Sequence, residues 1–180
     1  AKEEKVKEFD FGTLASGMEG KFRLGHFNGM ATIIEKFFKI ITPTKAFFGQ
    51  KDLQQLQIVK ALVKQINASI EIVSIPTIRE KNGLAKSSRN KLLSESAKNN
   101  AALIYNCLYY CKNNKEKGIV ELKSYINHKF KTQENLQLEY AEIVALNTMQ
   151  PIETWQGKKR NAICIAAYHS GVRLIDNIIL

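Results

Sequence analysis

The chain has 180 residues, enough for one sizeable hydrophobic core or for two small domains. Hydrophobic residues make up 44% and charged residues 24%, which excludes the disordered and fibrous classes. The net charge is +10, a value that raises the possibility of nucleic-acid binding. The lysines are scattered among glutamates, however, and no basic run of five or more occurs. We therefore expect no nucleic-acid partner; steeply salt-dependent binding of DNA or RNA would indicate the alternative.

The three cysteines and the lack of a long apolar run indicate in which cellular compartment the protein is expected. Cys107, Cys111 and Cys164 are odd in number and lie within apolar patterns, which predicts buried thiols in a reducing compartment rather than disulfides. No run approaches the length of a membrane span, and the charged start of the sequence lacks a secretory h-region. The expectation is a soluble, cytoplasmic protein with no membrane partner.

The least patterned part of the chain is residues 1–25, which are polar and contain four glycines. Within it, Phe9, Phe11 and Leu14 are a candidate for a short strand.

The next part of the chain alternates helical and strand patterns. Residues 27–41 carry apolar side chains at helical spacing, and residues 45–49 form a short apolar run closed by glycine. Residues 52–66 predict a second helix and residues 70–75 a second buried strand. This order is the β-α-β rhythm of a parallel sheet.

The rhythm changes after residue 88. Helices are predicted around residues 97–111 and 119–130, and a strand around residues 138–146. Two further apolar runs, 162–168 and 172–178, are split by a Ser-Gly pair and predict an antiparallel hairpin. The chain is therefore predicted to be α/β, with a parallel-sheet domain over residues 1–88 and a smaller α+β domain over residues 89–180.

Polar segments follow both predicted parallel strands. The first covers residues 49–55 and the second residues 76–90. Because ligands of a parallel sheet bind outside the carboxyl ends of its strands, the two segments are expected at the same edge. Either segment alone is typical of a capped helix or an exposed loop, whereas the pair favours a phosphate or nucleotide site as strongly as it favours ordinary loops.

The residue types in the first segment suit an anionic ligand. Gly49 allows a close approach to the backbone, and Lys51 places a positive charge at a helix N-terminus. Asp52 can cap that helix or hold a ribose hydroxyl, and Gln55, one turn further on, can both donate and accept hydrogen bonds.

The second segment combines a turn, two hydroxyls and three cations. Asn82-Gly83 is a turn signal, Ser87 and Ser88 supply the hydroxyls, and the cations are Arg79, Lys86 and Arg89. The expected arrangement has Ser87, Ser88 and Arg89 closing over phosphates from the side opposite the first segment.

Both polar segments contain motifs, and further motifs lie in other parts of the chain. The motifs are Gly25-His-Phe-Asn-Gly29, Phe48-Gly-Gln-Lys-Asp-Leu-Gln-Gln55, Pro76-Thr-Ile-Arg-Glu80, Gly83-Leu-Ala-Lys-Ser-Ser-Arg-Asn90 and Arg173-Leu-Ile-Asp-Asn177. In these motifs the chain closely resembles a known family, the pantoate–β-alanine ligases. The motifs occur in the family's order from about Phe9 onwards.

The resemblance implies a fold, a reaction and partners. The parallel sheet would be the remnant of a Rossmann-like domain of the adenylyl-transferase type. The enzyme would use ATP and Mg2+ to convert pantoate to pantoyl adenylate and pyrophosphate. The amine of β-alanine would then attack the adenylate to give pantothenate and AMP. The family also implies a homodimer.

The family's binding residues transfer to matching positions of this sequence. The implied ATP-binding residues are Gly49, Gln50, Lys51, Asp52, Ile78, Lys86, Ser87, Ser88 and Arg89. The implied pantoate-binding residues are Gln55, Met30 and Ile33, and Ile34 matches either a pantoate contact or the helix core. Three positions depart from the family pattern: Gln50 replaces a glutamate, Lys86 replaces a methionine beside the phosphates, and Leu24 replaces a proline.

The family's Met-Gly-x-Leu-His-x-Gly-His motif is absent from the 180 residues. His26, His128 and His169 lie in other contexts and are expected to be structural or surface residues. We therefore expect no catalytic residue and no metal ligand in this chain, which resembles a C-terminal portion of the enzyme. The alternative is a non-catalytic binding module that associates through an exposed sheet.

Overall fold

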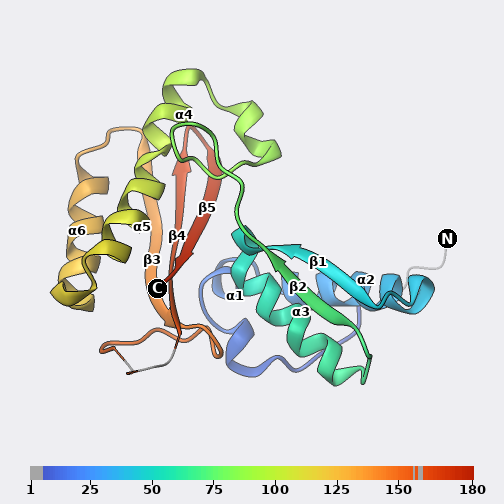
Figure 1. The fold of residues 1–180 in the computed structure, drawn as a ribbon. Helices are drawn as coiled ribbons and strands as arrows, with labels where there is room; N and C mark the ends of the chain where they lie inside the picture. The colour runs from blue at the N-terminus through green and yellow to red at the C-terminus, as the bar shows by residue number, and fades with distance from the viewer. Residues whose placement is uncertain (1–5, 156, 158–159) are drawn as a thin grey trace. The chain divides into compact units, whose positions relative to one another are not determined.

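The computed structural model describes residues 6–155, 157 and 160–180 (Figure 1). Its contacts divide the chain into two compact units, Ala1–Ile75 and Pro76–Leu180. The first unit holds a two-stranded parallel sheet and the second a three-stranded antiparallel sheet, which confirms the predicted α/β class. Residues 76–88 belong by their contacts to the second unit, so the compact units divide earlier than the predicted domain boundary between residues 88 and 89.

The first unit follows the predicted alternation of helices and strands. Its elements are η1 (Gly12–Ala15), α1 (Glu19–Phe22), α2 (His26–Ile41), β1 (Lys45–Gly49), η2 (Gln50–Asp52), α3 (Leu53–Gln65) and β2 (Glu71–Ile75). Strands β1 and β2 pair in parallel, with Gly49 opposite Ile75. The two carboxyl ends therefore meet at one edge of the sheet, as the β-α-β pattern predicts.

The core of the first unit lies between the sheet and its two long helices. Phe38 of α2 and Val59 and Val63 of α3 form a buried cluster, and Ala46, Phe48 and Ile72 of the sheet pack against it. Alternation along β1 turns Phe47 to the opposite face, where it is 64% exposed. One face of the sheet is thus covered by helices, and the other presents an aromatic side chain to solvent. The prediction that residues 70–75 form a buried strand is therefore wrong, because every residue of β2 is exposed or half-buried.

The predicted strand around Phe9 and Phe11 is wrong. Phe11 is buried in a cluster with Phe27, Ile58 and other side chains of α2 and α3, and its ring stacks on Phe9 with 5.7 Å between centroids. The backbone hydrogen bonds of this stretch go to a turn, because Leu14 N–H donates to the carbonyl of Phe11 at 3.1 Å. The aromatic residues are anchors of a loop, and Gly12, at φ +51°, interrupts any strand.

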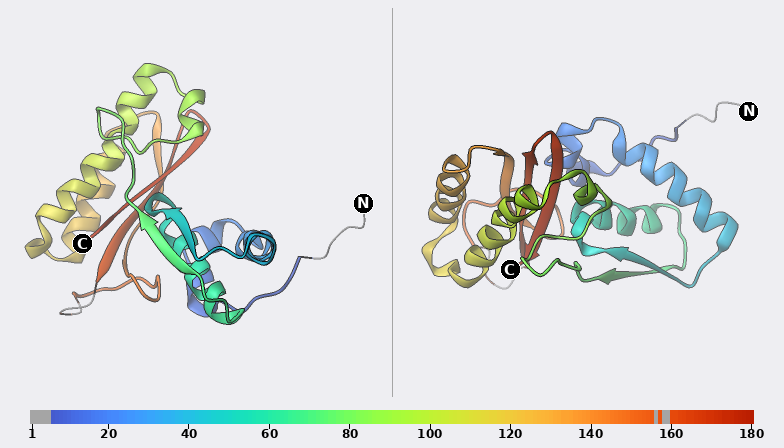
Figure 2. Two further views of the ribbon diagram at one scale, coloured as in Figure 1. Left: turned by 45° about the vertical axis from the view of Figure 1, so that its right-hand side comes forward. Right: turned by 90° about the horizontal axis from the view of Figure 1, so that it is seen from above.

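The second unit contains the predicted helix pair and hairpin. Its elements are η3 (Ser88–Leu92), α4 (Glu95–Ala101), α5 (Leu103–Asn113), η4 (Lys115–Lys117), α6 (Ile119–Lys131), β3 (Leu136–Ala145), β4 (Asn161–His169) and β5 (Val172–Ile179). Figures 1 and 2 show α5 and α6 covering one face of the sheet, whose strand order is β3-β4-β5. The helix predicted over residues 97–111 is two helices, α4 and α5, which join at Ala102.

The turn between β4 and β5 has the backbone that its sequence predicts. Ser170 and Gly171 have φ values of +49° and +77°, the left-handed pair of a two-residue hairpin turn. Glycine adopts this conformation without strain, and the antiparallel register continues from the turn along both strands. The predicted hairpin is confirmed.

The core of the second unit is larger and contains two of the three thiols, those of Cys107 and Cys111. Leu122 and Ile126 of α6, Leu108 of α5 and Ile163 and Ile165 of β4 are all nearly inaccessible to solvent. The cysteines are free and buried, as predicted. Burial raises the pKa of the Cys107 thiol to about 11 and that of the Cys111 thiol to about 12, so both are protonated and unreactive at neutral pH.

His169 is a buried titratable group at the end of β4. It is 3% exposed, and its Nδ1 lies 3.0 Å from Ser170 Oγ. Its Nε2 is buried and has no hydrogen-bond partner among the described residues. Burial lowers the pKa of the imidazole below its ordinary value of 6.5, because removal from water disfavours the charged form. The expected structural role of this histidine agrees with its position.

We expect the second unit to lose stability in mild acid through His169. As the pH falls through about 6.5, His169 becomes protonated in the unfolded chain but stays neutral in the folded chain, where its pKa is lower. The free energy of unfolding therefore decreases as the pH falls, until the pH drops below the folded pKa. Urea unfolding followed by fluorescence of Trp155, the single tryptophan, measures this from pH 8 to pH 5. His169→Gln should reduce the pH dependence, whereas replacement of the exposed His128 should leave it unchanged.

Candidate functional site

The carboxyl edge of the parallel sheet presents an open glycine and a helix N-terminus. Gly49 ends β1 and is exposed, and a Cβ added there would meet no protein atom within 4 Å. The chain then makes the short helix η2 and enters α3, which has 13 residues. Such a helix carries partial positive charge at its first turn, where backbone N–H groups lack partners within the helix. The edge can therefore accept an anion close to the backbone.

Lys51 and Asp52 lie at this helix start. Lys51 is half-buried and Asp52 is exposed. Asp52 occupies the N-cap position of α3, as predicted, but its side chain makes no capping hydrogen bond. Its carboxylate is thus not committed to the helix, which leaves the predicted alternative of a ligand hydroxyl.

A polar cluster accompanies this edge within the first unit. His26, at the start of α2, is half-buried, and burial is the largest cause of its lowered pKa. The positive charge of Arg23 lowers the pKa further, while the carboxylates of Glu19 and Asp52 oppose the shift. His26 is therefore neutral at pH 7, in keeping with the expected structural role.

Two adjacent glutamines of α3 have different surroundings. Gln54 is 5% exposed, and its Nε2 donates to the carbonyls of Leu14 at 2.8 Å and Gly17 at 2.9 Å. Its Oε1 accepts the backbone N–H of Glu19 at 3.0 Å. Gln55 is half-buried. Gln54 therefore fastens the N-terminal loop to α3, whereas Gln55 stays the predicted pantoate ligand.

The motifs assign no role to Gln54. The signal was present, since Gln54 falls four residues before Ile58 and eight before Leu62, on the buried face of α3. A glutamine on that face must find polar partners inside the protein.

The two apolar residues assigned to pantoate differ in exposure. Met30 packs against both buried clusters of the first unit, while Ile33 is 56% exposed. Ile34 also packs against both clusters, which agrees with the helix-core alternative. Of the three, Ile33 offers the most surface to a ligand.

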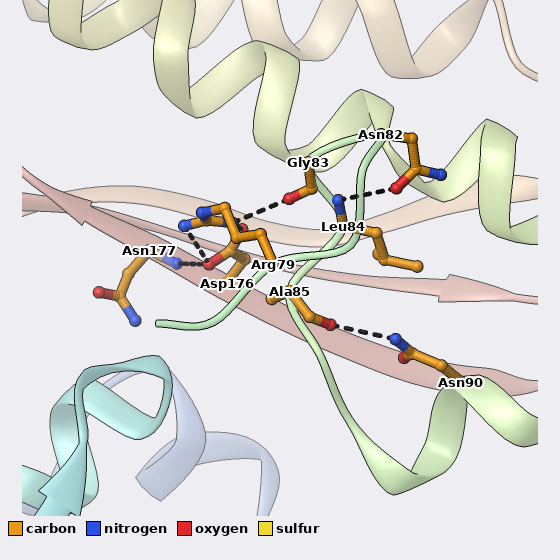
Figure 3. A network of polar contacts seen from close by, with 8 residues as sticks. All are labelled: Arg79, Asn82, Gly83, Leu84, Ala85, Asn90, Asp176 and Asn177. Carbon is orange, nitrogen blue, oxygen red and sulfur yellow. Dashed lines mark hydrogen bonds and ion pairs between the residues drawn. The ribbon is translucent and has the colours of Figure 1, made fainter. Parts of the chain in front are cut away.

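The second polar segment opens as a small hairpin in the second unit (Figure 3). Arg79 and Ala85 form an antiparallel bridge. Lys86 N–H donates to the carbonyl of Ile78 at 2.9 Å. Asn82-Gly83 forms the turn, as predicted, and Gly83 has a φ of +92°. The hairpin thus brings both ends of the stretch between Ile78 and Lys86 together.

Arg79 is engaged inside its unit. Its Nη2 lies 3.1 Å from Asp176 Oδ1, its Nη1 contacts Asp176 Oδ2, and Nη1 also donates to the carbonyl of Gly83 at 3.1 Å (Figure 3). The guanidinium also lies over the ring of Tyr105, 4.1 Å from its centroid. The sequence groups Arg79 with Lys86 and Arg89 as the three cations of a candidate anion-binding segment. The contacts assign it instead to a bidentate pair with Asp176.

Most residues of the segment 86–89 are exposed, and hydrogen bonds from side chains hold the backbone around them. Lys86, Ser88 and Arg89 are exposed and Ser87 is half-buried, with its Oγ accepting Arg89 N–H at 3.2 Å. Asn90 is 5% exposed, and its Nδ2 donates to the carbonyl of Ala85 at 3.2 Å. The donor groups of the segment 86–89 are thus exposed between two backbone positions that hydrogen bonds hold, at Lys86 and at Asn90.

The structure brings each predicted set together within its own unit. Gly49, Gln50, Lys51, Asp52 and Gln55 follow β1 in the first unit; Ile78 (67% exposed) and the segment 86–89 follow β2 in the second unit. Among the described residues, no group of three or more His, Cys, Asp or Glu could hold a metal ion. Mg2+ bound to a nucleotide takes most of its ligands from phosphates and water, so one or two carboxylates suffice to hold it.

Comparison with known proteins defines the class of this α/β chain. A family model described as pantoate-beta-alanine ligase matches residues 3–179. The chain belongs to the pantoate–β-alanine ligase family, as the sequence motifs predict.

Named relatives and solved structures agree with this family. A pantothenate synthetase of Azobacteroides pseudotrichonymphae is 45% identical over 98% of this chain and 63% of its own length. One of Christiangramia forsetii is 44% identical over 97% of this chain and 62% of its own. The chain therefore spans about three fifths of the curated relatives it matches.

Two structures show the same fold. The pantothenate synthetase of Thermus thermophilus matches with a TM-score of 0.86 at 32% identity, over 93% of this chain and 60% of that one. The pantoate-beta-alanine ligase of Francisella tularensis, complexed with beta-gamma ATP and beta-alanine, matches with a TM-score of 0.71 at 32% identity, over 96% of this chain and 57% of that one.

Proposed function

We propose that this chain carries part of the ATP and pantoate site of a ligase that joins pantoate to β-alanine through a pantoyl adenylate. The observation that supports it most is the parallel pairing of β1 and β2, whose carboxyl ends Gly49 and Ile75 are neighbours. Both polar segments start from this edge. Family membership and the nucleotide complex of the Francisella tularensis relative support ATP as the ligand.

In this proposal each residue of the site binds or orients a substrate. Lys51, at the start of α3, and Arg89 neutralise phosphate charge, and Ser87 and Ser88 donate hydrogen bonds to phosphate oxygens. Exposed Ile78 lies against the adenine. Mg2+ would enter with the nucleotide, whose phosphates Lys51, Ser87, Ser88 and Arg89 would hold, and it would supply further positive charge beside the phosphate that the pantoate carboxylate attacks.

Pantoate is held from the first unit. Gln55 hydrogen-bonds its polar groups, and Met30 and Ile33 provide an apolar wall for its methyl groups. The amine of β-alanine then attacks the carbonyl carbon of the pantoyl adenylate, and AMP leaves. Gly49, Gln50 and Asp52 complete the nucleotide side, through close backbone approach and through hydrogen bonds to the ribose.

Removing either proposed phosphate cation is expected to weaken binding of Mg-ATP. Lys51→Ala and Arg89→Ala should each raise the dissociation constant roughly 10- to 100-fold, because a charge-assisted hydrogen bond contributes about 1.5–3 kcal/mol. Isothermal titration calorimetry measures this on the 180-residue chain. Matched controls are Lys64→Ala, in the last turn of α3, and Arg160→Ala, exposed in the second unit. Equal losses in controls and test variants would contradict a specific site.

The same chain is expected to bind ATP without sustained turnover. None of its three histidines lies in the His-x-Gly-His context that the family resemblance assigns to acid chemistry. A coupled assay for AMP release with pantoate, β-alanine and Mg-ATP tests this expectation. Robust turnover by these residues alone would contradict it, and no ATP binding at all would overturn the proposed site.

A second candidate function, association through an exposed face, is supported by the surface of the first unit. Ile33, Phe37 and Ile40 of α2 recur at helical spacing and are all more than half exposed. Such a patch on a monomer marks an interaction surface, and the family resemblance implies a homodimer in the cytoplasm. None of the helices in the described part of the chain is both long and apolar enough to cross a membrane. Sedimentation analysis of the chain and of Phe37→Glu distinguishes monomer from dimer.

A further inference from the structure

The loop that carries the proposed phosphate ligands is fastened to the last strand of its unit by one buried charged pair. We propose that Arg79 and Asp176 are positioning residues for the segment 86–89. By fixing the base of the hairpin, they determine where Ser87, Ser88 and Arg89 present their donors to the triphosphate. This inference rests on the proposed function of that segment, and it adds two residues to which the family resemblance assigned no role.

Asp176 provides the fixed point. It lies in β5 opposite Ile165 of β4 and is 4% exposed. Its Oδ1 also accepts the backbone N–H of Asn177 at 2.8 Å, so the carboxylate is held by its own strand. A carboxylate this deeply buried requires a charged partner, because an isolated buried charge is strongly destabilising. Within the unit, that partner is Arg79.

Arg79 makes three kinds of contact at once. Its fork of donors binds both oxygens of Asp176, one of its nitrogens also reaches the carbonyl of Gly83, and its flat face stacks on Tyr105 of α5. Lysine could supply the charge but neither the bidentate fork nor the stacking surface. The geometry of the guanidinium, in addition to its charge, is therefore what locks the hairpin against β5 and α5.

The position of Arg79 is transmitted to the proposed ligands through short backbone connections. Arg79 bridges to Ala85, and the carbonyl of Ala85 accepts the side-chain amide of buried Asn90 at 3.2 Å. On the other strand of the hairpin, the carbonyl of Ile78 accepts the N–H of Lys86. Both ends of the segment 86–89 are thus tied to residues next to Arg79, and Figure 3 shows the connection from Ala85 to Asn90. A shift of the guanidinium changes the position of the whole segment.

The matched control is a second paired arginine, which lies in β5, the strand that contains Asp176. Arg173 of β5 binds Glu139 of β3, with Nε 3.0 Å from Oε2. The side chain of Arg173 is 18% exposed and that of Arg79 is 19% exposed. Arginine-to-lysine substitution at either position therefore removes a similar buried fork, but only one of the two forks lies at the base of the hairpin.

The experiment compares Arg79→Lys, Asp176→Asn and Arg173→Lys in the 180-residue chain. Amide deuterium exchange of residues 84–92 should become at least about tenfold faster in the first two variants and stay unchanged in the third. The dissociation constant for Mg-ATP, measured by calorimetry, should rise about tenfold in the same two variants. Unfolding followed by Trp155 fluorescence shows whether each variant remains folded.

Several results would contradict a positioning role for Arg79 and Asp176. Unchanged exchange in folded Arg79→Lys and Asp176→Asn would overturn it, as would a uniform increase across the unit that Arg173→Lys reproduces. Failure of both test variants to fold would assign the pair a purely structural role. If the unmodified chain does not bind Mg-ATP, the proposed function fails, whereas the exchange measurement still decides whether the pair braces the segment.

Discussion

Replacing Gly83 with alanine is expected to destabilise the second unit by about 3 kcal/mol, through backbone strain and steric overlap together. Gly83 has a φ of +92°, a value that L side chains rarely adopt, and an added Cβ would lie 2.3 Å from Cδ1 of Tyr105. Tyr105 cannot move away freely, since its ring lies under the guanidinium of Arg79. Urea unfolding followed by Trp155 fluorescence measures the change.

A glycine elsewhere in the chain provides the matched control. Gly29 lies inside α2, and a Cβ added there meets nothing within 4 Å. Gly29→Ala should therefore stabilise the first unit by about 0.5–1 kcal/mol, the usual gain of alanine over glycine in a helix. The double variant Gly83→Ala/Tyr105→Ala should lose less stability than the two single changes added together, because it removes the overlap. Full additivity would show that backbone strain alone is responsible.

Replacing Gln54 with alanine is expected to destabilise the first unit by about 3 kcal/mol. The substitution leaves three backbone groups of the N-terminal loop without their partner: the carbonyls of Leu14 and Gly17 and the N–H of Glu19. Each unpaired group in a poorly hydrated position contributes about 1 kcal/mol or more. Thermal unfolding followed by circular dichroism, with amide exchange of α3, measures the loss.

Substitution of the neighbouring Gln55 distinguishes an effect on stability from an effect on ligand binding. Gln55→Ala should change the free energy of unfolding by less than about 0.5 kcal/mol, since Gln55 is only half-buried. If Gln55 binds pantoate as proposed, its loss should instead weaken pantoate binding. Equal destabilisation by the two substitutions would contradict the distinction between a structural Gln54 and a ligand-binding Gln55.

Local patterns were sufficient to predict most elements of the fold. The run at residues 45–49 is short, apolar and closed by glycine, and it forms β1 with those bounds. Ser170-Gly171 lies between two apolar runs, and it forms the turn of the β4–β5 hairpin. In both cases neighbouring residues alone determine the conformation, so no tertiary information was needed.

The sequence-based predictions were wrong where burial or contacts between distant residues determine the structure. Phe9 and Phe11 carry strand-forming side chains, but the cluster that buries Phe11 comes from two helices further along the chain. Arg79 was grouped with the other cations of its segment because its partner, Asp176, is 97 residues away and no local pattern connects them. Candidate site residues could therefore be proposed from motifs, whereas the contacts that hold them required the structure.

The long separation of that ion pair has a consequence for biosynthesis. A ribosome makes Pro76–Asn90 long before it makes β5, and residues of a nascent chain can pair only with what has already emerged. The hairpin therefore acquires its brace only when Asp176 has left the exit tunnel and β5 has joined β4. A chain interrupted within the last strand would contain every proposed ATP ligand, yet its phosphate segment would lack the anchor that orders it.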